Sequence, residues 1–204
     1  MRTLLTFSLL ALTTIAHAEQ RERTLFDFED GSRSNWRTVN DGVMGGRSVG
    51  RYQVTDSDAL EFFGTLSLAN NGGFASVRSR GNRLGLEPGD SLVLRVRGDG
   101  RKYSLNLYTP TRRMAFSYRA EFQTKRDTWI EIALPLDRFY ATSFGRRVRS
   151  TLKPADVSGV GIVLGDKKAG PFKLQVDWIK VRSALPQAAA ATASPDVLAD
   201  SDPQ

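Results

Sequence analysis

Apolar and polar residues alternate with a period of two along most of the central part of this chain. The pattern is clearest in four stretches, at 92–97, 103–108, 116–122 and 129–134. Successive side chains of a β-strand point to opposite faces of a sheet, so each stretch predicts a strand with one buried face. No stretch carries the 3.6-residue period of a long helix, and the sequence therefore predicts an all-β fold.

Further strands are predicted by the same reasoning at 24–28, 50–55, 58–68, 73–80, 157–164 and 172–182. Together they make about nine or ten short strands, a number typical of an antiparallel β-sandwich or jelly roll. Asp99 and Gly100 separate two of the strands and favour a tight hairpin between them. In the last strand the apolar residues change parity, which predicts a β-bulge near Asp177.

The beginning of the chain has the composition of a signal peptide. Arg2 precedes an apolar run at 4–15, and the small residues Ala16 and Ala18 follow it, as at a signal-peptidase site. The run is shorter than the roughly 20 apolar residues that span a bilayer. We therefore expect a signal peptide at 1–18, a mature chain without a transmembrane segment, and a periplasmic or secreted location.

The end of the chain, 184–204, is rich in Ala, Ser, Pro and Asp and has no periodic apolar face. Such a segment buries too little apolar surface to offset the entropy of ordering it, so it predicts a disordered tail. The expected organisation is a signal peptide at 1–18, one β-sandwich domain at 24–183 and a tail at 184–204.

The residue types exclude several kinds of catalysis. His17 is the only histidine and the chain has no cysteine, so a chain cut after residue 18 lacks Ser-His and Cys-His pairs and the usual zinc ligands. Paired carboxylates or a hard cation remain possible. The carboxylates are scattered, and we predict no enzymatic activity and no cofactor except a possible structural calcium held by Glu29 and Asp177.

The segment at 36–48, WRTVNDGVMGGRS, lies between two predicted strands and reads as a connection. Its glycines indicate positive backbone angles or close approaches, and Asn40 and Asp41 can bond neighbouring backbone. Trp36 and Met44 are large apolar residues for a loop. The segment is either a cover pinned over one end of the sandwich or the wall of a binding site.

A second candidate surface depends on which strands are neighbours. If 90–97, 101–109, 115–122 and 128–134 share a sheet, their outward residues gather on one surface: Arg95, Arg97, Ser104, Asn106, Tyr108, Ser117, Arg119, Trp129 and Glu131. An exposed Trp and Tyr among polar groups suits stacking on a sugar ring or a wet protein interface. The alternative is an ordinary solvent-facing sheet surface.

The chain is basic, with a formal net charge of +7. Its basic residues form short clusters, such as Arg146, Arg147 and Arg149, rather than a continuous stripe with interleaved aromatic residues. This pattern argues against nucleic acid as a partner. Anionic targets such as membrane headgroups or acidic glycans remain possible, and their binding would weaken with salt.

Five blocks resemble, in order, the complex I intermediate-associated protein family: 26–48, 62–79, 94–107, 122–139 and 170–181. The resemblance implies a galactose-binding-like β-sandwich related to carbohydrate-binding modules. It also places Asn71, Phe74 and Arg78 near the loop that holds Trp36, Asn40, Asp41 and Met44. We therefore hypothesise that Asp41 pairs with Arg78 or Arg97.

Mitochondrial members of the resembled family act as chaperones in the assembly of respiratory complex I. The predicted function is an exported, non-enzymatic binding module that helps to assemble a protein complex, with a protein partner in the cell envelope. One alternative is a carbohydrate-binding protein of the envelope, for which Trp129 and Tyr108 must form one exposed platform. The other is a hydrolase, for which two carboxylates must converge in a cleft.

Overall fold

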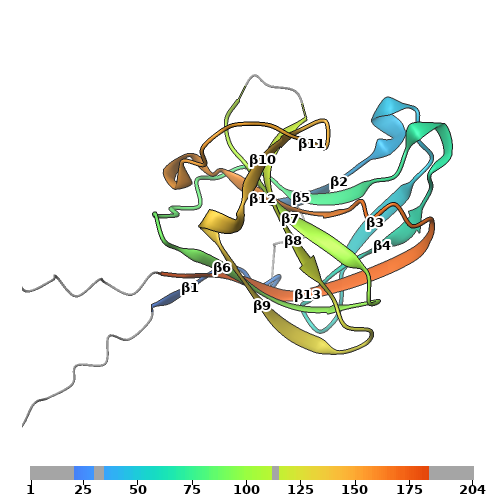
Figure 1. The fold of residues 1–204 in the computed structure, drawn as a ribbon. Helices are drawn as coiled ribbons and strands as arrows, with labels where there is room; N and C mark the ends of the chain where they lie inside the picture. Colours follow the sequence, from blue (N-terminus) through green and yellow to red (C-terminus); the bar gives the residue numbers. More distant parts are fainter. Residues whose placement is uncertain (1–20, 30–34, 112–114, 184–204) are drawn as a thin grey trace, which may run out of the picture. The chain divides into compact units, whose positions relative to one another are not determined.

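The structure is a computed structural model that describes residues 21–29, 35–111 and 115–183. The predicted signal peptide at 1–18 and tail at 184–204 lie outside the described residues, and the domain boundaries stay predictions. The described residues form thirteen strands connected by loops and short 3-10 turns (Figure 1). Every strand pairing is antiparallel, as the sequence predicts.

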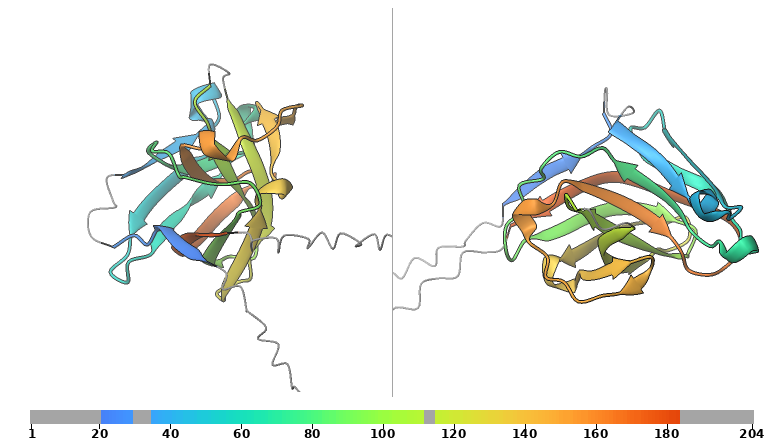
Figure 2. Two further views of the ribbon diagram at one scale, coloured as in Figure 1. Left: turned by 90° about the vertical axis from the view of Figure 1, so that its left-hand side faces the viewer. Right: turned by 90° about the horizontal axis from the view of Figure 1, so that it is seen from above.

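The strands form two sheets that face each other (Figures 1 and 2). The six-stranded sheet has the order β3 (Val49–Val54), β4 (Leu60–Leu66), β13 (Gly170–Arg182), β6 (Ser91–Gly98) and β9 (Trp129–Pro135), and β1 (Glu22–Phe26) also pairs with β13. The seven-stranded sheet has the order β11 (Arg146–Arg147), β10 (Tyr140–Ser143), β8 (Phe116–Gln123), β7 (Lys102–Tyr108), β12 (Gly159–Leu164), β5 (Ala75–Ser79) and β2 (Trp36–Asn40). The predicted β-sandwich is confirmed.

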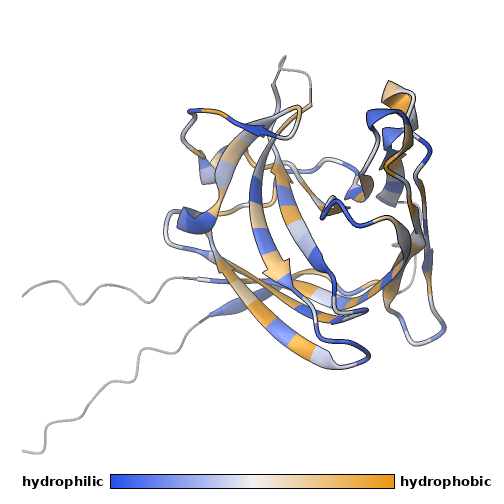
Figure 3. Cartoon of the chain, turned by 45° about the vertical axis from the view of Figure 1, so that its right-hand side comes forward, coloured by the Kyte–Doolittle hydropathy of each residue, from blue (hydrophilic) through white to orange (hydrophobic). Residues whose placement is uncertain are grey.

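The core lies between the two sheets and takes every second residue of most strands. Figure 3 shows the alternation of hydrophobic and hydrophilic residues along the strands. The inward residues are buried almost completely, among them Leu60, Phe62, Leu92, Leu94, Leu105, Leu107, Ile162, Leu164, Leu174 and Val176. Full burial of one such side chain contributes roughly 1.5–3 kcal/mol, so this layer stabilises a domain that has no disulfide.

The predicted bulge in the last strand is confirmed. The register between β13 and β6 shifts between Val176 and Trp178. Because of this shift, Leu174 and Val176 before the bulge and Ile179 and Val181 after it all point into the core. The extra residue, Asp177, remains on the outside, where it pairs with Arg95.

Two local predictions are wrong. The turn at Asp99 and Gly100 does not make a hairpin, because β6 lies in the six-stranded sheet and β7 in the seven-stranded sheet. Gly100 does adopt a positive φ of 85°, but the turn carries the chain from one sheet to the other. Residues Trp36–Asn40 form strand β2 rather than a loop, because they pair along their whole length with β5.

Candidate functional site: a cleft on the outer face of the seven-stranded sheet

A cleft of about 710 Å³ opens on the outer face of the seven-stranded sheet, opposite the core. Its floor consists of outward residues of β5, β7, β8, β10 and β12. One wall comes from the loop after β2 and from residues 71–74, and the other comes from the β10–β11 connection at 144–145 and from Arg146 of β11. Surface clefts of this size are the usual places for ligands or partner segments.

A row of polar side chains crosses the floor. Strand pairing sets Arg37 opposite Arg78, Arg78 opposite Gly161, Gly161 opposite Asn106, and Asn106 opposite Arg119. Directly paired residues on one face of a sheet have neighbouring side chains. The row therefore places three guanidinium groups and one amide on a single line across five strands.

Gly161 leaves space in this row for two larger neighbours. A Cβ atom at Gly161 would lie 2.9 Å from Cε2 of Tyr108 and 3.0 Å from Cγ of Arg78. The guanidinium carbon of Arg78 lies 4.9 Å from the centre of the Tyr108 ring, which is a cation–π contact. The missing side chain therefore lets the Tyr108 ring and Arg78 stack over the middle of the sheet.

Three buried polar atoms of the floor have no hydrogen-bond partner among the described residues. They are Oδ1 of Asn106, the hydroxyl of Tyr108 and Nε of Arg119. Asn106 is only 4% exposed, and a buried polar group without a partner costs free energy. All three atoms belong to residues that line the cleft, so the floor of the cleft holds unsatisfied hydrogen-bonding groups.

The Tyr108 hydroxyl stays protonated and can act as a donor. Burial raises the pKa of Tyr108, although the nearby positive charges of Arg78, Arg119 and Arg37, and then the side-chain amide of Asn106, act in the opposite direction. A neutral phenol can donate one hydrogen bond and accept another. The floor thus presents hydrogen-bond donors together with positive charge.

The other polar groups of the floor bond one another and fix its shape. Nδ2 of Asn106 donates to Oγ of Ser117 at 2.9 Å, and the hydroxyls of Ser117 and Thr142 lie 3.3 Å apart. Nε of Arg78 donates to Oγ of Ser76 at 3.1 Å. These bonds orient Asn106 and Arg78, the two residues that flank Gly161.

Asp41 holds the first wall together. Its buried carboxylate accepts bonds from the amide of Ser48 at 2.8 Å, the hydroxyl of Ser48 at 2.5 Å, the amide of Gly73 at 2.6 Å and the amide of Phe74 at 3.3 Å. Burial by itself would raise the pKa of Asp41, but these hydrogen bonds outweigh it and hold the pKa below its usual value. Asp41 is therefore ionised, and its hydrogen bonds hold two loops together.

The glycines of this wall pack directly against the carboxylate. A Cβ atom at Gly46 would lie 2.3 Å from Cγ of Asp41, and one at Gly72 would lie 2.5 Å from Oδ2 of Asp41. Neither position has room for a side chain. The motif at 36–48 is thus both a pinned loop and a wall of the cleft, which combines the two interpretations.

The rim of the cleft is apolar and exposed. Val43 is 74% exposed, Met44 56% and Phe144 60%, and all three line the cleft. Val43 and Met44 stand on the wall that Asp41 organises, and Phe144 stands on the wall opposite. Exposed apolar groups around polar ones are typical of interaction surfaces.

The charges that line the cleft are all positive. Arg78, Arg119, Arg146 and Lys167 line it, and no Asp or Glu does so among the described residues. None of these four cations takes part in an ion pair within the described part of the chain. The cleft therefore has an uncompensated positive potential.

The structure brings together seven of the residues predicted to bind: Met44, Asn71, Phe74, Arg78, Asn106, Tyr108 and Arg119. Trp36 instead packs in the core against Phe26 and Phe28. Asn40 donates to the backbone oxygen of Gly50 and does not line the cleft. Asp41 lies behind the wall, where it supports the site without reaching its interior.

The predicted single surface is wrong, because its residues lie on two sheets. Arg95, Arg97, Trp129 and Glu131 belong to β6 and β9 of the six-stranded sheet, whereas Ser104, Asn106, Tyr108, Ser117 and Arg119 belong to β7 and β8 of the seven-stranded sheet. The guanidinium carbons of Arg95 and Arg97 lie 5.2 and 5.0 Å from the ring centre of Trp129. Trp129 and Tyr108 therefore cannot form one platform for a sugar.

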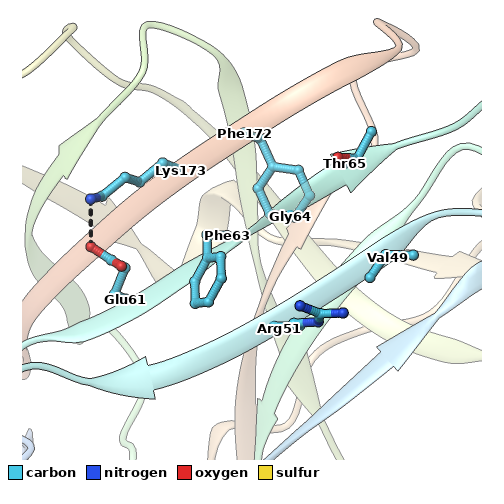
Figure 4. Close-up of a pocket in the computed structure, with 8 residues that line it drawn as sticks. All are labelled: Val49, Arg51, Glu61, Phe63, Gly64, Thr65, Phe172 and Lys173. Atoms are coloured by element: carbon cyan, nitrogen blue, oxygen red, sulfur yellow. Dashed lines mark ion pairs between the residues drawn. The ribbon is translucent and has the colours of Figure 1, made fainter.

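Several polar groups on the outer face of the six-stranded sheet bond one another. Arg97 donates to Oε1 of Gln175, and Nε2 of Gln175 donates to Glu61 at 2.8 Å. Glu61 also pairs with Lys173 at 2.7 Å beside the Phe63 ring, in a depression of about 570 Å³ (Figure 4). This closed network contrasts with the unpartnered atoms of the cleft.

The hypothesis that Asp41 pairs with Arg78 or Arg97 is wrong. The carboxylate of Asp41 is occupied by Ser48, Gly73 and Phe74. Arg78 bonds Ser76, and Arg97 bonds Gln175 on the other sheet. The loop amides therefore take the role that the hypothesis gave to a guanidinium group.

The hydrolase alternative requires two carboxylates in one cleft, and the predicted calcium site requires Glu29 and Asp177 together. No group of three or more His, Cys, Asp or Glu side chains that could hold a metal ion occurs among them. Of the proposed calcium ligands, Asp177 is paired with Arg95 and Glu29 is exposed. Neither the cleft nor the depression is lined by two carboxylates, so the requirement of the hydrolase alternative is not met there.

Sequence reasoning missed several residues of the cleft. Gly161, Val43, Phe116, Phe144 and Thr142 were not candidates, although Gly161 shapes the floor and the others line the cleft. The alternation in β12 puts Gly161 on the outer face, and this signal was available. Nothing in the sequence shows that the β10–β11 connection returns over that face.

The fold is a β-sandwich domain with a polar cleft on the outer face of one sheet. A family model, complex I intermediate-associated protein 30 (CIA30), matches residues 26–176, more than half of the chain. The chain therefore belongs to this family. Among the described residues no helix is long and apolar enough to cross a membrane.

Curated relatives agree with the family. The chain is 28% identical over 186 residues to the mitochondrial complex I intermediate-associated protein 30 of Mus musculus, with 79% of this chain and 56% of the relative covered. It is 36% identical over 99 residues to the probable counterpart of Caenorhabditis elegans, with 44% and 28% covered. The chain thus spans about half the length, or less, of these relatives.

Solved structures agree with the fold. A family 11 carbohydrate-binding module from Clostridium thermocellum, in complex with a mixed-linked tetrasaccharide, superposes with a TM-score of 0.60 at 15% identity and covers 80% of this chain and 96% of the module. The family 11 module of the cellulase Lic26A-Cel5E gives 0.59 at 16% identity, with 82% and 98% covered. At this identity the likeness establishes the β-sandwich fold alone.

The predicted periplasmic or secreted location is wrong. The curated relatives from mouse and from two Caenorhabditis species are named as mitochondrial proteins. The apolar run at 4–15 suggested export because length and flanking residues were the only guide.

Proposed function

We propose that this protein is a non-catalytic assembly factor that binds a protein partner through the cleft of the seven-stranded sheet. The observation that carries the proposal is the set of three unpartnered polar atoms, on Asn106, Tyr108 and Arg119, beneath an apolar exposed rim. A partner that forms hydrogen bonds with the floor and apolar contacts with the rim would satisfy the polar atoms and cover the exposed apolar side chains. Membership of the CIA30 family supports a protein of respiratory complex I as that partner.

The composition of the cleft supports a protein partner. Arg, Met and aromatic residues are enriched in protein interfaces, and all three kinds line this cleft, as Arg78, Arg119, Met44, Tyr108 and Phe144. Tyr and Arg are also among the residues that most often dominate interface energetics. On the other sheet, by contrast, Arg97, Gln175, Glu61 and Lys173 bond one another.

Affinity purification of the tagged full-length chain from cells of its source organism tests the proposal, with co-purifying proteins identified by mass spectrometry. We expect subunits of respiratory complex I or of its assembly intermediates. The double variant Arg78→Gln and Arg119→Gln should lose them. A matched control, Arg51→Gln and Arg83→Gln, removes the same charge at exposed positions outside the cleft and should retain them. Equal recovery of complex I subunits by the cleft double variant and by the control double variant would contradict the role of the cleft.

Carbohydrate binding at the same cleft is the second candidate function. It is favoured by the amide, hydroxyl and guanidinium groups of the floor around the Tyr108 ring, on a fold shared with carbohydrate-binding modules. Calorimetric titration with a mixed-linked β-1,3-1,4 tetrasaccharide tests it. Saturable heat that disappears in Tyr108→Ala would support this function, and the absence of heat with the folded wild-type protein would remove this ligand from consideration.

A further inference from the structure

The positive charges of the cleft indicate the charge of the group that binds there. Arg78, Arg119, Arg146 and Lys167 line the cleft without an ion-pair partner among the described residues, whereas Arg95, Arg101 and Lys173 elsewhere are paired with carboxylates. Cations that face one cavity repel one another and attract an anionic group. The chain as a whole, at +7, also repels cationic partners.

The geometry points to an extended acidic peptide segment of the partner, and this inference rests on the proposed function. The carboxylates of the segment would pair with Arg78 and Arg119 on the floor, and apolar side chains between them would contact Val43, Met44 and Phe144 on the rim. Arginine forms paired hydrogen bonds with carboxylates, which makes it suited to such recognition.

The spacing of the two arginines fits an extended chain. Arg78 on β5 and Arg119 on β8 are separated by three steps between neighbouring strands, through β12 and β7. At about 4.8 Å for each step, their backbones lie roughly 14 Å apart. Residues i and i+4 of an extended peptide are about 13.5 Å apart and point to the same side. Acidic residues at positions i and i+4 would therefore reach both arginines. A peptide with an acidic residue at every second position contains such a pair.

The floor also accounts for the groups between the two arginines. The hydroxyl of Tyr108 and Nε of Arg119 are donors, and Oδ1 of Asn106 is an acceptor, and none has a protein partner among the described residues. A peptide offers carbonyl and carboxylate oxygens for the donors and amide hydrogens for the acceptor. A purely anionic sugar chain would leave the apolar rim residues without matching contacts.

Fluorescence anisotropy with the purified full-length chain tests the inference. The probe is a labelled pentapeptide of alternating Glu and Leu that begins and ends with Glu, and the comparison peptide has Gln in place of each Glu. We expect the acidic peptide to bind, the Gln peptide to bind at least about tenfold more weakly, and binding to fall steeply toward about 0.5 M salt. A labelled trigalacturonate serves as the acidic sugar.

Variants connect the signal to the cleft. Arg78→Gln and Arg119→Gln should each weaken the acidic peptide by about tenfold. Arg146→Gln and Lys167→Gln, at exposed positions, should weaken it by a smaller factor and keep the test valid if the floor variants unfold. Arg51→Gln, on β3 of the other sheet, should bind as the wild type does.

Three outcomes would overturn the inference: no binding of the acidic peptide by the folded protein, equal loss in Arg51→Gln and the cleft variants, or preference for trigalacturonate over the peptide. Failure of the peptide assay together with cleft-dependent co-purification of complex I subunits would overturn the acidic segment alone. Failure of both experiments would overturn the proposed function as well.

Discussion

The carboxylate of Asp41 accepts a 2.6 Å hydrogen bond from the backbone amide of Gly73, a residue 32 positions further along the chain. This bond joins the loop after β2 to the turn before β5 and builds one wall of the cleft from two distant segments. The side chain of Asn70 adds a second link, because its Nδ2 donates to the backbone oxygen of Gly45 at 3.2 Å. The arrangement accounts for Asp41 and for Gly46, where a Cβ atom would collide with the Asp41 carboxylate.

Asp41→Asn should destabilise the domain. The amide group of asparagine would present two hydrogens to the amides of Ser48, Gly73 and Phe74, so at least one buried donor would lose its acceptor. We expect the free energy of unfolding to fall by roughly 2–3 kcal/mol. Chemical denaturation followed by circular dichroism measures this change.

The matched control for this substitution is Asp56→Asn, at an exposed turn position. It removes the same charge without removing a buried acceptor, and the expected change is within about 0.5 kcal/mol. Equal stability of Asp41→Asn and Asp56→Asn would mean that the carboxylate does not organise the wall.

The stability that Asp41 supplies should depend on pH. Its hydrogen bonds hold its pKa below the ordinary value of 3.8. The contribution is therefore fully present above that value and is lost as the pH falls through the lower pKa of the folded state. The difference in unfolding free energy between the wild type and Asp41→Asn should shrink between about pH 5 and pH 2. A difference that grows on acidification would refute this assignment. Glu61 and Asp166, whose pKa values are also lowered, are present in both proteins.

Gly161→Ala should disturb the floor of the cleft. The new Cβ atom would lie 2.9 Å from the Tyr108 ring and 3.0 Å from Cγ of Arg78, so both side chains must move. We expect a loss of about 1–3 kcal/mol in stability, a changed near-ultraviolet circular dichroism signal, and weaker peptide binding. Gly159→Ala is the control on the same strand and face, where the nearest atom is Oγ of Ser79 at 3.3 Å. Normal binding by Gly161→Ala would separate ligand recognition from the Arg78–Tyr108 stack.

Trp129→Ala should leave binding at the cleft intact. Trp129 lies on the outer face of the six-stranded sheet beside Arg95 and Arg97, and its removal costs those contacts, or about 1–2 kcal/mol of stability. The affinity for the acidic peptide should stay within about twofold of the wild type. A large loss of affinity in a folded Trp129→Ala protein would place the site on the other sheet.

The period-two pattern predicts most of this fold because it records which side of each strand is buried. The parity change at Asp177 even locates a bulge, since burial on one face must be restored beyond it. The pattern says nothing about pairing partners. Asp99 and Gly100 have the chemistry of a tight turn, yet the turn joins two sheets because β6 pairs with β9 and β13, and β7 pairs with β8 and β12.

The candidate site is predicted only in part, because alternation shows which residues of a strand face outward but not which strands are neighbours. Outward residues such as Asn106, Tyr108 and Arg119 follow from alternation, but alternation cannot assign them to the same sheet as Arg78 or separate them from Trp129. The role of Asp41 depends on amides that lie 32 and 33 residues away. Those contacts arise from long-range topology, which the local pattern does not encode.

The most direct test of the central claim is photo-crosslinking in cells of the source organism. A benzophenone amino acid replaces Phe144 at the rim of the cleft in one variant and Val49, which is 47% exposed on β3, in the other. If the cleft binds the partner, the variant at 144 crosslinks to a subunit or assembly intermediate of respiratory complex I, and the variant at 49 does not. Crosslinks to such a subunit from position 49 alone would contradict the claim that the cleft is the binding surface.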